Sequence, residues 1–382
     1  LPKGINYAGY IGHSALRTYT MGERAFDEEA NEYEVKQMQA LVKEAMHAGA
    51  IGFSTSRTFN HTTADDRPVA SRLANWDEVR AIVNAVGETG KGIFEIAGEA
   101  PGRSPERNRE YHDRLRDLAV ESGVTQTWGM FSVKAAPDIW RPYFDLLDET
   151  ATAGGRMFAQ VHSRGLNNIL SFESATPYDN WELWRDIRAL PLHEQKARLG
   201  DPATKAKLIE IANREYIGPR IVGAEIRPPD WDYVFPMNDM SYDKPSMAQI
   251  AKEKGVDPVE LMIDMALEQD LKMFFRAPIA NENQDHVLEM IKHPRSVVTF
   301  SDSGAHVSQI MDSSLQTHLL SHWVREKEAL TLEDAVKQIT YNTATLWGLH
   351  DRGLLREGMA ADVVVFDPET VGPNMPEALN DL

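Results

Sequence analysis

The segment Leu332-Glu-Asp-Ala-Val-Lys-Gln-Ile-Thr-Tyr-Asn-Thr-Ala344 is followed shortly by Gly358-Met-Ala-Ala-Asp-Val-Val-Val-Phe366. Thr331 and Asp334 resemble a capping box, so the first stretch predicts a helix that begins at residue 332. The second predicts a short apolar strand near the end of the chain, and such a strand needs partners from elsewhere. This part of the chain is therefore expected to depend on further strands.

Upstream, short apolar strands alternate with amphipathic helices, a pattern that predicts a parallel sheet with helical crossovers. Helices are expected over residues 34–46, where Gly49 ends the helix, and from Ser246 and Asp257. The expected strands cover residues 5–10, 51–54, 92–96, 124–131, 156–161, 272–275 and 297–300.

The alternation fails between about residues 174 and 242, where Trp181, Trp184 and Trp231 gather and a helix is expected over 202–215. Loops at the mouth of a barrel carry its chemistry, so an aromatic-rich insertion is expected to act as a substrate lid. The alternative is an elaboration that serves packing or a subunit contact.

Composition narrows the class of protein. The 382 residues are 42% hydrophobic and 26% charged, which is typical of a globular enzyme, and the formal charge of -18 argues against a nucleic-acid or anionic-membrane surface. The chain has no cysteine and shows no signal peptide, so a cytoplasmic location is expected. Leu1 is not an initiator methionine, and we expect that N-terminal strands are missing.

Asp302 is the strongest candidate for a catalytic residue, because a carboxylate directly after a buried strand lies where barrel enzymes keep reactive groups. It stands in Val297-Val-Thr-Phe-Ser-Asp-Ser-Gly-Ala-His306, and His306 is a candidate for substrate binding. Ser-Asp-Ser-Gly is also ordinary turn sequence, which is the alternative.

Three further positions could carry chemistry. His162 follows the strand over 156–161, with Arg164 two residues on, and arginine suits capture of a substrate carboxylate; a loop-bonded pair is the alternative. Glu95 lies within an apolar strand, where burial requires a metal or an arginine partner. His13 follows the first strand and either lines the pocket or orients a loop.

His318 and His322 have the four-residue spacing of a helical metal pair, but the glutamate of the zinc-protease motif is absent, which favours a packed or solvated helix face. No glycine-rich phosphate motif follows a strand, and no serine lies in a nucleophile elbow. Nucleotide binding and serine hydrolysis are therefore not expected.

The two C-terminal stretches quoted first, with Trp347-Gly-Leu349 between them, resemble the closing signature of the amidohydrolase superfamily. Further stretches, including Gly12-His-Ser-Ala-Leu-Arg17 and Glu44-Ala-Met-His-Ala-Gly-Ala-Ile-Gly-Phe-Ser-Thr55, resemble its N-acyl-D-amino-acid deacylases, the D-aminoacylases. The resemblance implies a TIM-like (β/α)₈ barrel over residues 1–350, and the start of a small C-terminal β-sandwich over 351–382.

The resemblance also implies a divalent metal, expected to be zinc, that activates water for attack on an amide while a barrel-end aspartate shuttles the proton. Asp302 matches that aspartate and is expected to bind metal as well. Where the family places histidine ligands after two strands, this chain offers Glu95 and Met130, and methionine is a poor zinc ligand. The second metal position is therefore expected to be altered.

Three functions stay open on the sequence alone. The first is hydrolysis of a small N-acyl amino acid or related amide, by a protein that forms a homo-oligomer. The second is hydrolysis of a cyclic amide, a lactone or another small carbonyl compound. The third is a member of the superfamily that kept the barrel for binding after losing its metal ligands.

Overall fold

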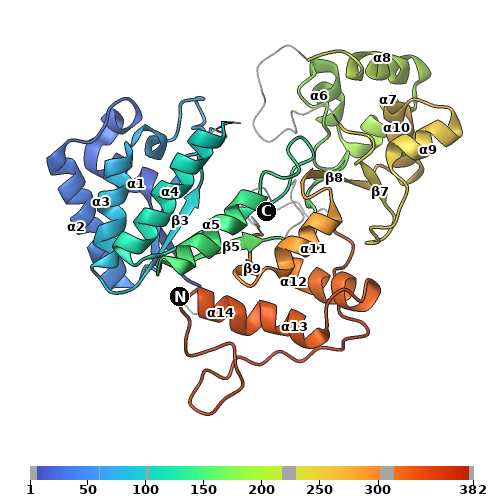
Figure 1. Cartoon of the computed structure of the whole chain (residues 1–382). Coiled ribbons are helices and arrows are strands. Elements are labelled where there is room, and N and C mark those ends of the chain that lie inside the picture. The colour runs from blue at the N-terminus through green and yellow to red at the C-terminus, as the bar shows by residue number, and fades with distance from the viewer. Residues whose placement is uncertain are drawn as a thin grey trace.

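A computed structural model describes residues 7–59, 61–99, 102, 104–216, 229–301 and 314–377. Six parallel strands form its main sheet in the order β1-β2-β3-β4-β5-β9 (Figure 1). The parallel sheet expected from the alternating pattern is thereby confirmed. The strands are β1 (Tyr10–Gly12), β2 (Gly52–Ser56), β3 (Ile93–Ala97), β4 (Thr125–Met130), β5 (Met157–Val161) and β9 (Ser296–Val298).

Amphipathic helices cover one face of this sheet. Apolar residues of the strands and helices form one buried cluster, which takes in Phe53, Phe94 and Val161 from the strands and Met38 and Val83 from the helices. These helices are α1 (His13–Met21), α2 (Glu32–Ala48), α3 (Trp76–Gly87), α4 (Pro105–Ser122), α5 (Arg141–Thr152) and α11 (Gln284–Lys292).

The opposite face is polar, and its side chains converge because the sheet curls. Gln160 on β5 donates to Glu95 on β3 across the intervening strand, with 3.1 Å between Nε2 and Oε1. Trp347 contacts both Tyr10 on β1 and Phe158 on β5, at ring-centroid distances of 6.3 and 5.5 Å. Strands four places apart thus share a neighbour, as in a segment of a barrel.

The C-terminal segment begins with α12 (Leu315–His318) and the π-helix η3 (Leu319–Glu326). The predicted helix start at residue 332 is confirmed, since the Thr331 side chain accepts from the Asp334 backbone N–H at 3.1 Å. That helix is α13 (Leu332–Lys337), which continues into η4 (Gln338–Asn342) and α14 (Thr343–Leu346). Residues 361–367 form no strand, and Val365 is 92% exposed, so the expected β-sandwich stays a prediction.

A second unit has its own sheet and its own apolar core. Its antiparallel strands are β6 (Leu166–Leu170), β8 (Phe274–Ala280) and β7 (Phe235–Met237), in that order. Helices pack on it around a cluster that includes Phe172, Trp184 and Met262. They are α6 (Glu182–Arg188), α7 (Leu192–Gly200), α8 (Pro202–Ala212), α9 (Met247–Lys254) and α10 (Pro258–Glu268).

One predicted strand lies in a different sheet from the one expected. The strand predicted over residues 272–275 overlaps β8, which begins at Phe274, but β8 pairs with β6 and β7 rather than with the parallel strands, and β9 takes the place next to β5. An apolar run specifies a strand but not its partner, because pairing depends on residues distant in sequence. Most of the expected insertion, about 174–242, falls in this second unit, and its role as a lid stays a prediction.

No helix within the described residues is long and apolar enough to span a bilayer.

Close packing of β2 on β3 constrains residue 52 to glycine. A Cβ on Gly52 would overlap the Ile93 carbonyl, whereas a Cβ on Gly9 would meet nothing within 4 Å. Gly52→Ala should therefore lower the free energy of unfolding by about 1–3 kcal/mol, because the two strands must move apart. Gly9→Ala is the matched control and should leave the stability nearly unchanged. Equal urea midpoints for the two variants would contradict this account of the packing.

Candidate active site

The carboxyl ends of the parallel strands bring several of the predicted site residues to one edge of the sheet. His13 directly follows β1 and His162 directly follows β5, while Thr299 to Ser301 continue from β9, the neighbour of β5. Asp302 and His306 lie outside the described residues, so their assigned roles stay predictions. Ser301, the residue before Asp302, is described and lies on this edge.

Glu95 lies on the inner, polar face of the sheet. Burial raises the pKa of its carboxyl, and the Tyr10 hydroxyl and the Gln160 amide partly oppose that rise. The described residues give it neither an arginine partner nor two further donors, since they contain no group of three or more histidine, aspartate or glutamate side chains that could hold a metal. By themselves, these residues do not fit a metal centre.

Met130 does not face Glu95. Its side chain is buried in the apolar cluster between the sheet and its helices, and Gly129 occupies the inner face one residue earlier. The Phe300 ring lies over that glycine, where an added Cβ would come within 2.5 Å of the ring. The prediction that Met130 stands in the place of a metal ligand is therefore wrong. Side chains alternate between the two faces of a strand, and this alternation turns residue 130 toward the helices.

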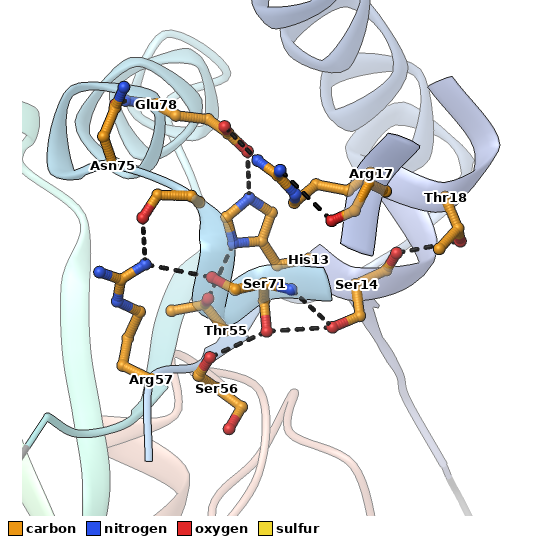
Figure 2. A network of polar contacts seen from close by, with 12 residues as sticks. His13, Ser14, Arg17, Thr18, Thr55, Ser56, Arg57, Ser71, Asn75 and Glu78 are labelled. Atoms are coloured by element: carbon orange, nitrogen blue, oxygen red, sulfur yellow. Dashed lines mark hydrogen bonds and ion pairs between the residues drawn. The ribbon is translucent and has the colours of Figure 1, made fainter. Parts of the chain in front are cut away.

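His13 belongs to a buried polar network (Figure 2). Its Nδ1 lies 2.8 Å from the Thr55 hydroxyl, and its Nε2 lies 2.8 Å from Oε1 of Glu78. Arg17 donates to the other oxygen of the same carboxylate. The network joins α1, β2 and α3, so of the two roles expected for His13 the contacts favour holding local structure in place.

Electrostatics of this network follow from its burial. Desolvation lowers the pKa of His13 by more than Glu78 raises it. Burial alone would raise the pKa of Glu78, but hydrogen bonds from His13 and Arg17 and their charges together lower it. The folded protein therefore holds an ionised Glu78 against Arg17, with His13 disfavoured as a cation.

His162 and Arg164 are both fully buried in the loop that leaves β5. The Arg164 backbone N–H points to His162 Nδ1 at 3.4 Å. Between them, the Ser163 hydroxyl donates to the Leu315 carbonyl, and the Ser163 carbonyl accepts from Trp323 Nε1, both at 2.6 Å. The loop is thus fixed to the helices behind it, and substrate binding by this pair stays a prediction.

His318 and His322 stack on one another with ring centroids 4.9 Å apart, and both contact the Tyr242 ring. His322 Nδ1 lies 3.0 Å from Oε2 of Glu326. Burial lowers the pKa of His318 well below its usual value, and the charge of Arg164 lowers it further. The two histidines therefore lie on a packed helix face, one of the two arrangements that the sequence favours over a metal site.

A pocket of about 430 Å³ lies beside this face, and sequence reasoning did not identify it. Arg276 on β8 lines this pocket, which we call the Arg276 pocket. The sequence signal that could have pointed to Arg276 is a charged residue within an apolar strand, the same signal that pointed to Glu95. The pocket is lined by Gly165, Asn167, Tyr233, Phe235, Tyr242, Asp243, Arg276, Pro278, Asn281, Glu282, Gln284, Asp285, Leu288, His322, Trp323, Lys327 and Ala329.

Removal of the Glu78 carboxylate should destabilise the fold. Glu78→Ala leaves the buried Arg17 and His13 without their partner, and breaking a buried pair in this way costs about 3–5 kcal/mol. Glu88→Ala, which removes the exposed partner of Lys43, is the control and should change the stability by less than about 1 kcal/mol. Chemical denaturation of both variants gives the comparison, and a similar loss in each would sink this role for the network.

Stability should also fall as the pH falls. His13 has a lower pKa folded than unfolded, so the unfolded chain binds more protons and stability is lost from about pH 6.5 downward; Glu78, also lowered, adds a further loss below about pH 4.5. His13→Asn removes the first of these contributions and should flatten the curve between pH 7.5 and 5. Other buried histidines with lowered pKa values, His112 and His318 among them, should preserve part of the slope. An unchanged slope in the variant, measured by urea unfolding across this range, would contradict the assignment.

Comparisons with known proteins agree with this geometry. Residues 229–378 match the model of the Amidohydrolase family. An uncharacterised protein of Mycobacterium tuberculosis is 24% identical over 404 residues, which cover 96% of this chain and 62% of the relative. N-acyl-D-aspartate deacylase of Alcaligenes xylosoxydans xylosoxydans is 26% identical over 371 residues, which cover 97% of this chain and 61% of that enzyme.

Among solved structures, N-acyl-D-glutamate deacylase of Bordetella bronchiseptica, complexed with zinc and a phosphonate mimic of the tetrahedral intermediate, aligns with a TM-score of 0.57 at 19% identity. The alignment covers 96% of this chain and 63% of that one, and it confirms the α/β fold of the barrel amidohydrolases. The chain thus spans about three-fifths of the length of these relatives. Residues 229–378 thus match the Amidohydrolase family model, and nearly the whole chain is similar in sequence to D-aminoacylases, the resemblance that its sequence predicted.

Proposed function

We propose that this protein is a metal-dependent hydrolase that cleaves the amide bond of a small N-acyl amino acid. One observation carries the proposal: the likeness to an N-acyl-D-aspartate deacylase extends over 97% of the chain. The curled parallel sheet supports it, because its carboxyl edge and polar inner face gather Glu95, Gln160 and His162 where barrel enzymes hold their substrates.

Asp302 is the proposed proton carrier. It follows Ser301, which lies three residues beyond β9, and the register of β9 with β5 sets Val298 level with Val161, the residue before His162. In the proposed reaction, water attacks the amide carbonyl, the Asp302 carboxylate accepts the proton that water loses, and the same group gives a proton to the departing nitrogen. The products are a carboxylic acid and a free amino acid, so atoms and protons balance.

Metal dependence enters the proposal through the relatives, one of which was solved with zinc. Zinc would supply polarisation of the carbonyl and a more acidic water. Glu95 is the one predicted ligand that the described residues place on the inner face, and Asp302 is the second predicted ligand. A cytoplasmic location and a homo-oligomer are part of the same proposal.

A binding protein without catalysis is the second candidate, and a specific observation favours it. Gly129 presents no ligand on the inner face of β4, and the Phe300 ring fills the space above it. Hydrolysis of a cyclic amide or a lactone stays within the first proposal, since the same proton transfer would serve either bond.

Asp302→Asn should abolish hydrolysis of N-acetyl-D-amino acids by the full-length gene product, because an amide side chain can neither accept nor return the proton. General acid-base groups contribute about 10²- to 10⁴-fold, so kcat should fall by that factor or more. Release of free amino acid measures the rate. Asp270→Asn, at an exposed aspartate paired with Lys196, is the matched control and should keep full activity. Undiminished hydrolysis in the Asp302 variant would exclude the role, and absence of hydrolysis in the zinc-supplied wild type would favour the binding protein.

A further inference from the structure

Arg276 is a buried cation held between two aromatic rings. It is 5% exposed, and its guanidinium lies 3.7 Å from the Tyr242 ring centroid and 4.8 Å from that of Phe235. Stacking of this kind fixes the plane of the guanidinium and leaves its N–H groups at the edges free to donate. The two rings therefore orient the arginine without using its hydrogen-bond donors.

Within the described parts of the chain, no carboxylate pairs with Arg276 and no acceptor bonds to it. Two acidic groups that line the Arg276 pocket already have partners, since Asp243 accepts from Lys327 at 3.0 Å and Glu282 accepts from the Lys134 backbone N–H at 3.2 Å; the third, Asp285, forms no ion pair with Arg276. A buried guanidinium without an anion is costly, and a ligand carboxylate would offset that cost.

The electrostatic surroundings point the same way. Arg276 and Arg164 both contribute positive charge that lowers the pKa of the neighbouring His318, after the larger effect of burial. Two cations thus act on one small region of a protein whose formal charge is -18.

Size and lining restrict the kind of anion. A pocket of about 430 Å³ suits a small molecule, and the walls from Tyr233, Phe235 and Trp323 suit an apolar group. Asn167 and Asn281 also line the pocket, and their amide nitrogens donate to the backbone carbonyls of Gly165 and Arg164. Carboxylates of Asp243, Glu282 and Asp285 at the same pocket disfavour a polyanion such as a nucleotide. One cation and apolar walls match a single carboxylate on an apolar body.

We propose that the Arg276 pocket binds the carboxylate of an N-acyl amino acid, with the guanidinium of Arg276 donating two parallel hydrogen bonds to the two carboxylate oxygens. The choice of ligand rests on the proposed function, whereas recognition of the carboxylate by Arg276 stands on the contacts above. Residues of β8, η3 and the segment from Phe235 to Asp243 meet at the pocket, so one carboxylate would join both units of the structure.

Binding without turnover tests the proposal. Isothermal titration of N-acetyl-D-leucine into full-length Asp302→Asn protein should give saturable binding, and N-acetyl-D-leucinamide, which lacks the carboxylate, should bind at least about tenfold more weakly. Arg276→Met should weaken binding of the acid by about tenfold or more, as expected for loss of hydrogen bonds to a charged group. Arg80→Met is the matched control, because that arginine is exposed, pairs with Glu121 and does not line the pocket, and binding should change less than about threefold.

Each outcome decides the question. Equal affinity for the acid and the carboxamide, or unchanged affinity in a folded Arg276→Met protein, would overturn the proposal. If circular dichroism shows that Arg276→Met does not fold, Arg276→Lys takes its place, because lysine keeps the charge but lacks the planar guanidinium that can donate two parallel hydrogen bonds. Arg276→Lys should bind the acid at least about fivefold more weakly than the parent protein. Undiminished binding would again overturn the proposal. Arg276-dependent binding without hydrolysis by the wild type would refute the proposed function alone, whereas hydrolysis with kcat/KM unaffected by Arg276→Met would refute this inference alone.

Discussion

A parallel sheet with helices on one face must still cover its other face, and most of this structure follows from that constraint. The strands run in one direction, so each needs a crossover helix, and the crossovers all bury the same apolar side chains. The remaining face carries polar groups such as Glu95 and Gln160, which cannot be left in an apolar interior. Curling the sheet brings these groups together, and Trp347 packs against that face across strands that are four places apart.

Charged groups inside the protein are treated in three different ways. Glu78 is surrounded by its own partners, Arg17 and His13, and serves to join three elements. Burial raises the pKa of the Glu95 carboxyl, and its neutral neighbours Tyr10 and Gln160 only partly oppose that rise. Arg276 has aromatic rings and no carboxylate among the described residues. The Glu78 carboxylate therefore has its ion-pair partners within the fold. Among the described residues, Glu95 on the inner face of the sheet and Arg276 in its pocket have no oppositely charged partner.

Local features of the fold could be predicted from the sequence, and non-local ones could not. Strand positions and the cap at Thr331 depend on neighbours a few residues away, and the structure places them close to where the patterns did. The partner of β8 depends on β6, over a hundred residues earlier, and no local pattern encodes it. Glu95 stands out in the sequence as a charged residue within an apolar strand, but its place on the inner face and the opposite direction of Met130 depend on how β3 and β4 lie in the sheet. The Arg276 pocket draws on segments spread over more than 160 residues, so a charged residue within an apolar strand could mark Arg276 but not the groups that surround it.

The glycine on β4 has a consequence for how this protein can change over generations. Phe300 fills the space above Gly129, so a larger side chain at residue 129 would have to displace that ring. A histidine could not be introduced at residue 129 by a single substitution without such a displacement. Residues 129 and 300 are therefore expected to vary together in a lineage, with a small residue at 300 wherever 129 is large. Replacement of a large residue at position 129 by glycine would then be easier than the reverse change, once a large side chain has filled position 300.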